Sequence, residues 1–478
     1  MSGQSAPEFL RWDMERLAAA LRQKQLSPVE VTRALLDRIE QVNPLLNAFI
    51  TVMGEEALAS AARAEAEIAK GDWRGPLHGV PVGIKDLIYT RNVRTTMGTN
   101  IYENYVPDYD ATVVAKLKEA GAVIIGKLNT HYFAYGPTGD RSAFGPVKNP
   151  HDLKKISGGS SSGSAAALAA GLCYAALGTD TGGSIRIPAS CCGIVGMKPT
   201  YGLVSKHGVY PLSWSLDHVG PMTRTVKDNA LLLNVLAGYD ADAPCSVRID
   251  AKDYTEMIGL DVKGTVVGVP ENYYFEGVQP EVNQQVQNAL RKLEELGARI
   301  RPVALPSLER FVSAQQMVIR CEAYVVHEPL LQEQGDLYEP EVKERLLTGK
   351  DEKAYQYIQA KQLRQAAIQE YVTALQSADV LVTPTLPILP PEIGQREIRF
   401  LGQDVLVRQV LTRLTSPTNY NGLPSLSVPC GFSVDGLPIG IQFIGKPWDE
   451  ARLYGVAYAL EQALALDTVK MDIQDNQG

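Results

Sequence analysis

The sequence predicts an α/β protein in which helices cover a central β-sheet. Helix-like and strand-like segments alternate along most of the chain. The amphipathic segment at residues 111–121 ends on a glycine and is followed by the apolar run AVIIGKLN. The same pairing recurs at residues 280–305, and again where a long helix predicted over residues 353–376 precedes ADVLVTP. Alternation of this kind is typical of a sheet whose faces are covered by helices.

The first part of the chain, about residues 8–70, is predicted to be mainly helical. Leucine and alanine recur at helical spacing, and Ser27 followed by Pro28 is a typical helix start. The three predicted helices cover Arg11–Gln25, Ser27 to about Gln41, and about Glu55–Lys70, where Gly71 ends the last one. In the next segment, HGVPVGIKDL, the apolar run Val80–Ile84 predicts a buried strand.

Composition excludes several classes of protein. The chain has 478 residues, 45% of them hydrophobic, and a net charge of −8, which allows a sizeable core and does not favour a nucleic-acid partner. Its six cysteines are scattered without a CxxC pair, as in a reducing compartment. The N-terminus lacks the pattern of a signal peptide, and the longest weakly polar run, Ser164–Gly178, is shorter than the ~20 residues of a membrane span. We therefore expect a cytoplasmic protein without a membrane partner.

The stretch KKISGGSSSGSAAALAAG at residues 154–171 has the composition of a flexible linker. Sheet-type segments lie close on both sides of it, however, and the alternation of helices and strands does not restart there. Its second half, Ser164–Gly171, has the small residues of a close-packed buried helix. We therefore predict a loop inside one domain.

A glycine- and serine-rich loop before a helix has several known uses. A phosphate-binding loop of the Walker type requires a lysine after its last glycine, and none follows Gly163. A nucleophile elbow of the form GxSxG matches residues 159–163 with Ser161 at its centre. That motif needs a strand immediately before it, whereas residues 148–157 resemble a loop.

A second cluster, LGTDTGGSIR at Leu177–Arg186, offers a better nucleophile. Two glycines before Ser184 let the backbone come close to a substrate, and consecutive N–H groups there can point at one developing oxyanion. A serine hydroxyl needs a base, and no histidine is near in the sequence. A lysine made neutral by burial can serve, and Lys85 at the end of the predicted strand in VGIKDL is the candidate.

Together, GIKDL, GGSSSGS and GTDTGGSIRIPA resemble the motifs of the amidase signature family, in the family's order. The resemblance extends from HGVPVGIKD at residue 78 through SPTNYNGLPSLSVPCG at residue 416 to GLPIGIQFIG at residue 436. It implies that Ser184 is the acylated nucleophile, that Lys85 is the base, and that Ser160 bridges them from the family's cis-peptide position. It also implies that backbone N–H groups bind the oxyanion at Thr181, Gly182, Gly183 and Ser184, while Thr179, Asp180 and Arg186 hold the shape of the loop.

The resemblance also implies an architecture and a reaction. The fold would be a single domain over residues 1–478 with a mixed central β-sheet surrounded by α-helices, a helical N-terminal segment at about 8–70, and a substrate-pocket helical region at about 305–380. The reaction would be hydrolysis of a carboxylic amide through an acyl-enzyme, without a metal or an organic cofactor. The partner is then a small-molecule amide substrate, and a homodimer is compatible with the family.

One segment bears on the substrate. The family usually has an acidic residue in the pattern KxNxxEFAxG, where KLNTHYFAYG of this chain has Tyr132. Ala134 and Tyr135 follow, in the segment that lines the acyl pocket of relatives. A small pocket rimmed by an aromatic ring favours an aryl or apolar acyl group.

Alternative functions share the same motifs. The chain could be the glutaminase subunit of a tRNA-dependent amidotransferase, whose pocket holds the ammonium group of glutamine with an acidic residue and its carboxylate with an arginine. Alignment with such subunits places Thr412 where their acidic residue is expected and Glu344 where their arginine is expected, with Arg345 next to it. We therefore predict a free-standing amidase. The motifs also fit a carbamate or ester hydrolase of the family, and the same fold could instead carry an inactive binding protein.

Overall fold

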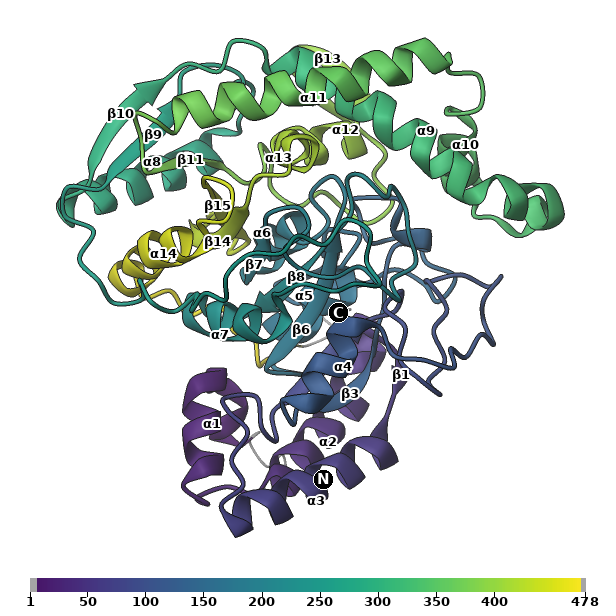
Figure 1. Ribbon diagram of the computed structural model, residues 1–478, viewed down its shortest axis with the longest axis vertical. Coiled ribbons are helices and arrows are strands. Elements are labelled where there is room, and N and C mark those ends of the chain that lie inside the picture. Colours follow the sequence, from purple (N-terminus) through teal and green to yellow (C-terminus); the bar gives the residue numbers. More distant parts are fainter. Residues whose placement is uncertain (1–6, 474–478) are drawn as a thin grey trace.

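The computed structural model describes residues 7–473 and is built around one large sheet of 11 strands (Figure 1). The strands of this sheet are β1 (Phe49–Val52), β2 (Pro81–Lys85), β3 (Val123–Leu128), β6 (Ala175–Asp180), β7 (Val195–Lys198), β8 (His218–Thr223), β9 (Val266–Pro270), β10 (Arg299–Val303), β11 (Val380–Pro384), β14 (Ser425–Phe432) and β15 (Pro438–Ile444). Their order across the sheet is β1-β3-β2-β6-β8-β7-β14-β15-β11-β9-β10.

The sheet is mixed. The pairs β2–β3, β2–β6, β9–β10 and β9–β11 are parallel. The remaining neighbours, from β6–β8 through β14 to β11 and including the edge pair β1–β3, are antiparallel. The predicted α/β fold, with a mixed central β-sheet surrounded by helices, is therefore confirmed.

The helices pack on both sides of the sheet and extend beyond it at both ends. They are α1 (Met14–Arg22), α2 (Pro28–Leu46), α3 (Gly54–Lys70), α4 (Thr112–Glu119), α5 (Ser162–Ala169), α6 (Arg186–Cys192), α7 (Val226–Leu236), α8 (Pro280–Glu295), α9 (Leu308–Gln334), α10 (Pro340–Leu347), α11 (Ala354–Ala374), α12 (Val407–Thr412), α13 (Ser416–Asn421) and α14 (Glu450–Leu464). Figure 1 shows α1–α3 at one end of the molecule and α9–α11 at the opposite end. Among the described helices, none combines the length and apolar character that crossing a membrane requires.

Local signals set the start of the N-terminal helices. The side chain of Asp13 accepts a hydrogen bond from the backbone of Arg16 at the start of α1. Ser27 accepts hydrogen bonds from the backbone of Val29 and Glu30 at the start of α2, which continues past the predicted end to Leu46. Such caps satisfy amide groups that the first turn of a helix leaves unpaired.

Short strands occur where the sequence did not indicate them. Within the N-terminal segment, Phe49–Val52 form β1, which pairs with β3 at the edge of the sheet. The prediction of a loop at residues 148–157 is wrong, because β4 (Lys148–Asn149) and β5 (Asp152–Ile156) form a separate antiparallel pair there. A second small pair, β12 (Glu397–Phe400) with β13 (Gln403–Leu406), precedes α12.

The lysine and serine motifs lie at the centre of the fold. β2 and β6 are neighbours in the sheet and are buried along their whole length, and α5 packs against both of them. All residues of α5 are buried. A side chain added at Gly163 would place its Cβ 2.5 Å from the backbone nitrogen of Asn129 and 2.3 Å from the carbonyl oxygen of Ala48. Small residues are therefore required for α5 to pack this closely, and the stretch is a buried loop and helix as predicted.

Candidate active site

Lys85 is the last residue of β2, and its side chain is fully buried. Its amine contacts three hydroxyl groups, with Nζ 2.8 Å from Ser160 Oγ, 2.9 Å from Ser161 Oγ and 2.8 Å from Thr179 Oγ1. Burial lowers the pKa of Lys85 well below its ordinary value, and the more distant charges of Asp180 and Asp217 only partly oppose this shift. The site therefore favours an uncharged amine, as a general base requires.

Ser160 and Ser161 lie in the loop before α5, and the peptide bond between Gly159 and Ser160 is cis. Both side chains are buried. The hydroxyl of Ser161 is engaged by the backbone of Thr179, since Oγ donates to the carbonyl oxygen at 3.2 Å and accepts from the amide at 3.2 Å. Within residues 7–473, the hydroxyl of Ser160 contacts only Lys85. Ser160 is thus the serine whose proton is available to Lys85.

This geometry also bears on the nucleophile-elbow alternative. A strand, β5, does precede the GSSSG loop, but it forms a separate two-stranded sheet with β4 and one further bridge, from Lys155 to Glu392, and is not part of the large sheet. Ser161 itself is fully buried and hydrogen-bonded to backbone, so its hydroxyl is not presented to a substrate. Its amine neighbour is Lys85, and no histidine contacts it within the described residues. The geometry disfavours Ser161 as the nucleophile.

Ser184 follows β6 in the second loop and keeps 9% of its surface exposed, whereas Ser160 has none. The two loops are joined by a hydrogen bond from the Ser161 amide to the Ser184 carbonyl at 3.1 Å. The structure therefore brings all three predicted catalytic segments together: the end of β2, the start of α5 and the loop after β6. Of the three residues, Ser184 is the one that a substrate can reach.

The second loop is held by a buried ion pair. Asp180 Oδ1 lies 3.0 Å from Arg186 Nη2, and both side chains are fully buried. Burial alone would raise the pKa of Asp180, but Arg186, Lys198 and Asn419 hold it well below its ordinary value. Arg186 also donates to three residues near the end of the chain: Thr418, Asn419 and Gln442. These contacts fit the predicted shape-holding role of Asp180 and Arg186. Thr179, predicted for the same role, instead contacts Lys85.

The backbone N–H groups of the loop are not equivalent. The amide of Gly183 donates to Asp180 Oδ1 at 2.8 Å, so it is not free to bind an oxyanion as the sequence suggested. No hydrogen bond within residues 7–473 engages the amides of Thr181, Gly182 or Ser184. These three remain candidates for the oxyanion hole.

Gly183 has a different requirement. Its φ is +131°, and an added Cβ would lie 2.1 Å from Thr415 Oγ1. That hydroxyl already donates to the carbonyl oxygen of Gly182 at 2.7 Å, which fixes the neighbouring backbone. Position 183 therefore needs glycine for its conformation and for the space that Thr415 occupies.

Two small cavities flank the loop, and the predicted pocket residues are divided between them. Tyr135 and Gly182 line a cavity of about 130 Å³, which we call the Gly182-side cavity. Ala134 and Thr181 line another of about 170 Å³, the Thr181-side cavity. Ala134 and Tyr135, which the sequence analysis placed in one small acyl pocket, thus line two different cavities.

The Gly182-side cavity is cationic. Its lining includes Arg320, Arg345 and Arg408, together with Gln315, Gln316, Gln409 and Thr412. Arg320 pairs with Glu352 at 2.8 Å, and Arg408 approaches Glu341 at 3.8 Å.

Arg345 differs from the other two arginines. It stacks over the Tyr135 ring, 3.9 Å from its centroid, and donates one hydrogen bond to the Tyr135 carbonyl oxygen at 3.2 Å. It forms no ion pair within residues 7–473, and burial lowers the pKa of its guanidinium. Most of its five N–H donors are therefore left for a ligand.

The alignment that placed Glu344 at the arginine position is corrected by this arrangement. Glu344 is exposed, and Arg345, one residue further along α10, lines the cavity. Successive helix residues point about 100° apart, so a shift of one residue decides which side chain faces the cavity. Thr412 lines the cavity as the alignment suggested.

The Thr181-side cavity has aromatic and apolar walls that include Tyr210, Pro211, Leu212 and Trp214. Its wall is anchored by Glu322, a buried carboxylate that sequence reasoning missed. Glu322 accepts from the hydroxyls of Ser213 and Ser215, both at 2.6 Å, and from Tyr357 at 2.8 Å. The sequence carries a hint of this anchor in the pattern SWS at residues 213–215, where two serines flank Trp214. Asp217 was also missed, and it accepts from Thr181 Oγ1 at 2.6 Å.

Tyr132 lines neither cavity. Its hydroxyl lies within hydrogen-bond distance of Asn100 Oδ1 and of the Leu337 carbonyl oxygen, both at 3.0 Å. Its ring packs edge-on against Phe133, with centroids 5.2 Å apart. The departure from the family's acidic residue therefore serves packing and says nothing about the substrate.

Comparison with known proteins identifies the family of the chain. The sequence profile of the family described as Amidase matches residues 30–454. A subunit of the glutamyl-tRNA(Gln) amidotransferase from Geobacter sp. (strain M21) is 43% identical over 480 residues, covering 95% of this chain and 98% of that protein.

Solved structures extend the likeness to the whole fold. A protein from a vestigial complex that reveals the origins of an s-triazine catabolic enzyme superposes with a TM-score of 0.92 at 32% identity, covering 96% of this chain and 100% of that one. A bacterial aryl acylamidase of the amidase signature family superposes with a TM-score of 0.86 at 30% identity, covering 95% of this chain and 96% of that one. The chain belongs to the amidase signature family.

Proposed function

We propose that this protein hydrolyses small amides that carry a carboxylate, through an acyl-enzyme on Ser184. The observation that carries the proposal is Arg345, a half-buried arginine without an ion-pair partner in residues 7–473, in a cavity that shares Gly182 with the catalytic loop. A planar guanidinium with free donors matches a carboxylate, which it can bind through two parallel hydrogen bonds.

The contact between Lys85 Nζ and Ser160 Oγ supports the following reaction. Lys85 takes a proton from Ser160, which takes one from Ser184 as its oxygen attacks the amide carbon. The oxyanion that forms is stabilised by free backbone N–H groups of the loop, those of Thr181, Gly182 and Ser184. Return of the proton through Ser160 to the leaving nitrogen breaks the C–N bond and releases the amine or ammonia. Water, deprotonated by the same route, then hydrolyses the ester on Ser184 and regenerates the enzyme.

The proposal changes the substrate expected from the sequence. Three arginines and several glutamines around the Gly182-side cavity suit an anionic, polar group better than an aryl or alkyl acyl group. The apolar walls of the Thr181-side cavity remain available for the other end of the substrate. The carboxylate therefore lies on the Gly182 side, with the scissile amide over Ser184.

A second candidate is the glutaminase activity of a tRNA-dependent amidotransferase. Identity of 43% over nearly the whole length of a subunit of such an enzyme favours it, and Arg345 suits the carboxylate of glutamine. Thr412, however, offers no charge to the ammonium group of glutamine. Loss of a charge-assisted contact costs about 1.5–3 kcal/mol, or roughly 10- to 100-fold in the use of glutamine.

A substrate panel separates the candidates. The purified chain is assayed with succinamic and glutaramic acid, which carry a carboxylate without an ammonium group, and with glutamine, butyramide, an anilide, an ethyl carbamate and an ethyl ester. We expect the two acid amides to be the best substrates. Preference for the anilide, the carbamate or the ester would contradict the proposal, and so would preference for glutamine.

Arg345→Gln gives the decisive variant. It should lower kcat/KM for the acid amides about 10- to 100-fold, mainly through KM, and leave butyramide almost unchanged. Glu344→Gln is the matched control, because its side chain is adjacent but exposed. Equal effects of the two substitutions would remove Arg345 from substrate binding.

A further inference from the structure

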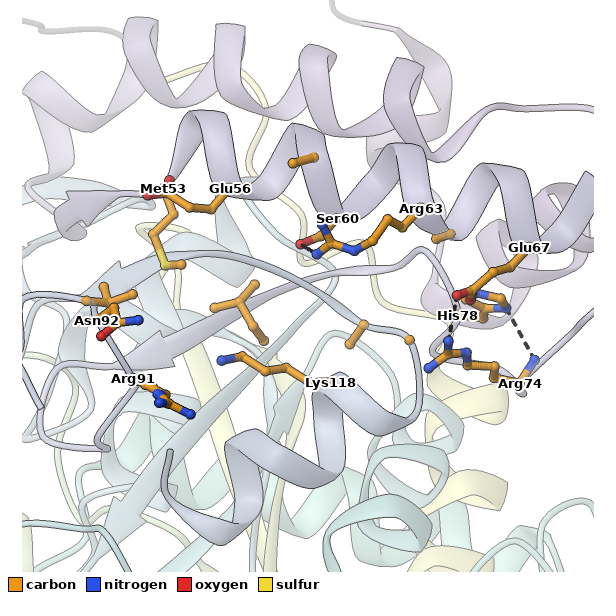
Figure 2. A pocket seen from close by; sticks show the side chains of 16 residues that line it. Met53, Glu56, Ser60, Arg63, Glu67, Arg74, His78, Arg91, Asn92 and Lys118 are labelled. Atoms are coloured by element: carbon orange, nitrogen blue, oxygen red, sulfur yellow. Dashed lines mark hydrogen bonds and ion pairs between the residues drawn. The ribbon is translucent and has the colours of Figure 1, made fainter. Parts of the chain in front are cut away.

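A larger cavity lies away from the catalytic loops, between α3 and the segment that carries α4 and β3 (Figure 2). Its volume is about 460 Å³, and it shares no lining residue with either cavity beside Ser184. A space of this size is typical of small-molecule sites. The catalytic mechanism makes no use of it.

Positive charges gather on two opposite walls of this cavity. Figure 2 shows Arg63 and Ser60 on α3 across from Lys118 and Arg91. Arg63 Nη2 donates to Ser60 Oγ at 2.8 Å, which holds the guanidinium against its own helix. Neither Arg63 nor Arg91 forms a side-chain ion pair within the part of the chain that the structure describes. Both side chains are exposed, so a protein with a net charge of −8 keeps two guanidinium groups without an ion-pair partner among its described residues beside one open cavity.

The other charges at the cavity are mostly paired. Glu67 lies 2.6 Å from Arg74 and 2.9 Å from the ring of His78, so this end of the cavity is electrostatically satisfied. Lys118 pairs with Asp110 at 2.7 Å. Glu56, the remaining lining carboxylate, lies beside Met53 in Figure 2, at the end away from the Glu67 cluster. That end also holds Arg91 and Asn92 in Figure 2, and the lining as a whole has four cationic side chains, Arg63, Arg74, Arg91 and Lys118, against the two carboxylates Glu56 and Glu67.

Part of the cavity wall is apolar. Met53, Val93, Ala122 and Ile124 line it, together with the backbone at Gly121. A cationic opening next to an apolar surface suits a ligand that has an anionic group on a hydrophobic body. Guanidinium pairs bind phosphate especially well, because its oxygens accept several charge-assisted hydrogen bonds at once.

We propose that this cavity is a second binding site, for a small phosphate monoester with an apolar body. Arg63 and Arg91 contact the phosphate from opposite walls, with Lys118 beside them. The apolar part of the ligand lies against Met53 and Ile124. The proposal does not depend on the substrate proposed for Ser184.

Phenyl phosphate tests the site by isothermal titration calorimetry, with inorganic phosphate and benzoate as comparison ligands. Phenyl phosphate should bind at least about tenfold more tightly than either, because only it combines two negative charges with a ring. Its affinity should fall as salt is added, since the contacts are partly exposed. Equally weak binding of all three ligands would mean an adventitious ion only and would overturn the proposal.

Substitutions of single arginines test where phenyl phosphate binds. Arg63→Gln and Arg91→Gln should each weaken phenyl phosphate binding about tenfold or more, whereas Arg22→Gln, an exposed position on α1, should not. Amide hydrolysis by both variants should stay at the level of the unaltered protein, which shows that they fold. Arg345→Gln should leave phenyl phosphate binding unchanged. Binding lost in Arg345→Gln but kept in Arg63→Gln and Arg91→Gln would place the ligand at the catalytic cavity and refute the second site.

Discussion

Ser160 and Ser161 are adjacent, both are buried, and both touch Lys85, yet the structure gives them different chemistry. The hydroxyl of Ser161 is committed to the backbone of Thr179, so it anchors Lys85 to the end of β6. The hydroxyl of Ser160 has no such commitment within residues 7–473. A proton can therefore move through Ser160 without breaking a structural contact.

Labelling with a serine-reactive phosphonate tests the assignment of the nucleophile. Among Ser160, Ser161 and Ser184, Ser184 is the one that retains some accessible surface, so peptide mass analysis should find the adduct there. Ser161→Ala should slow labelling by loosening Lys85 but should not move the adduct. An adduct on Ser161 in the unaltered protein would revive the nucleophile elbow.

Lys85 makes the reaction dependent on pH in a defined direction. Because burial holds its pKa well below the ordinary value, a larger share of the amine is uncharged than in an exposed lysine at the same pH. As the pH falls through that lowered pKa, Lys85 takes up a proton, and kcat/KM should decline with a single ionisation. Lys85→Arg keeps a positive charge at every accessible pH, so it should be inactive across the neutral range and on either side of it. Substantial activity in that variant would show that Lys85 is not the base.

Several residues of the site could be predicted from sequence because they lie inside dense motifs. Lys85 at a strand end and Ser184 after two glycines could be proposed from their local context, whereas Ser160 was singled out only by the resemblance to the family. Arg345 and Glu322 could not be predicted in this way, since each acts through residues far away in the sequence. Arg345 meets Tyr135, and Glu322 meets Ser213 and Ser215. Contacts of this kind depend on how α9 and α10 pack.

At the scale of elements, the loop between β6 and α6 is fixed from two sides. Asp180 and Arg186 hold it from within the fold, and Thr415 holds it from the segment before α13. The positive φ at Gly183 lets the chain pass between these two supports. Preorganisation of this loop keeps its N–H groups oriented before the substrate arrives.

Gly183→Ala should disrupt that loop. The added methyl group would collide with Thr415 Oγ1 and would require an unfavourable backbone conformation. We expect kcat to fall by at least about 100-fold, the size of effect seen when an oxyanion-hole donor is lost. Circular dichroism checks that the fold is retained. Gly182→Ala is the comparison, because the nearest atom to its added Cβ is 3.8 Å away, and a larger loss there than at Gly183 would contradict the steric argument.

Long periodic elements were predictable, and short ones were not. α3 and α11 have clear length and end signals, and the structure places them close to the predicted bounds. β1 has four residues and β4 has two, so each carries too little pattern to be recognised. Both exist because a neighbouring strand offers them hydrogen-bond partners, which is a property of the assembled sheet.

At the scale of the whole molecule, the open question is whether the chain works alone. Relatives that share its full length include subunits of an amidotransferase and an aryl acylamidase. The three catalytic segments and both flanking cavities are formed by residues of this one chain. Lys85, Ser160 and Ser184, which the proposed mechanism uses, all belong to this chain.

The purified chain should therefore hydrolyse succinamic acid without a partner protein. Its mass under assay conditions can be followed by light scattering, so that activity is assigned to a defined species. A chain that is inert until a second protein is added, and that then prefers glutamine, would establish an amidotransferase component instead. Ser184→Ala serves as the control for contaminating hydrolases.

The order of strands in the sheet has a consequence for how the protein is made. β14 lies beside β7 (Val195–Lys198) inside the sheet and β15 lies beside β14, but both come from residues 425–444 and are synthesised long after β7. Arg186 depends on the same late segment, since it bonds to Thr418 and Gln442. The two contacts of Arg186 join residues that are 232 and 256 positions apart in the sequence. Ser184, two residues before Arg186, therefore leaves the ribosome long before the residues that hold its loop have been made. A growing or prematurely ended chain would carry the nucleophile without the ability to use it, and amides in the cell would be attacked only by finished molecules.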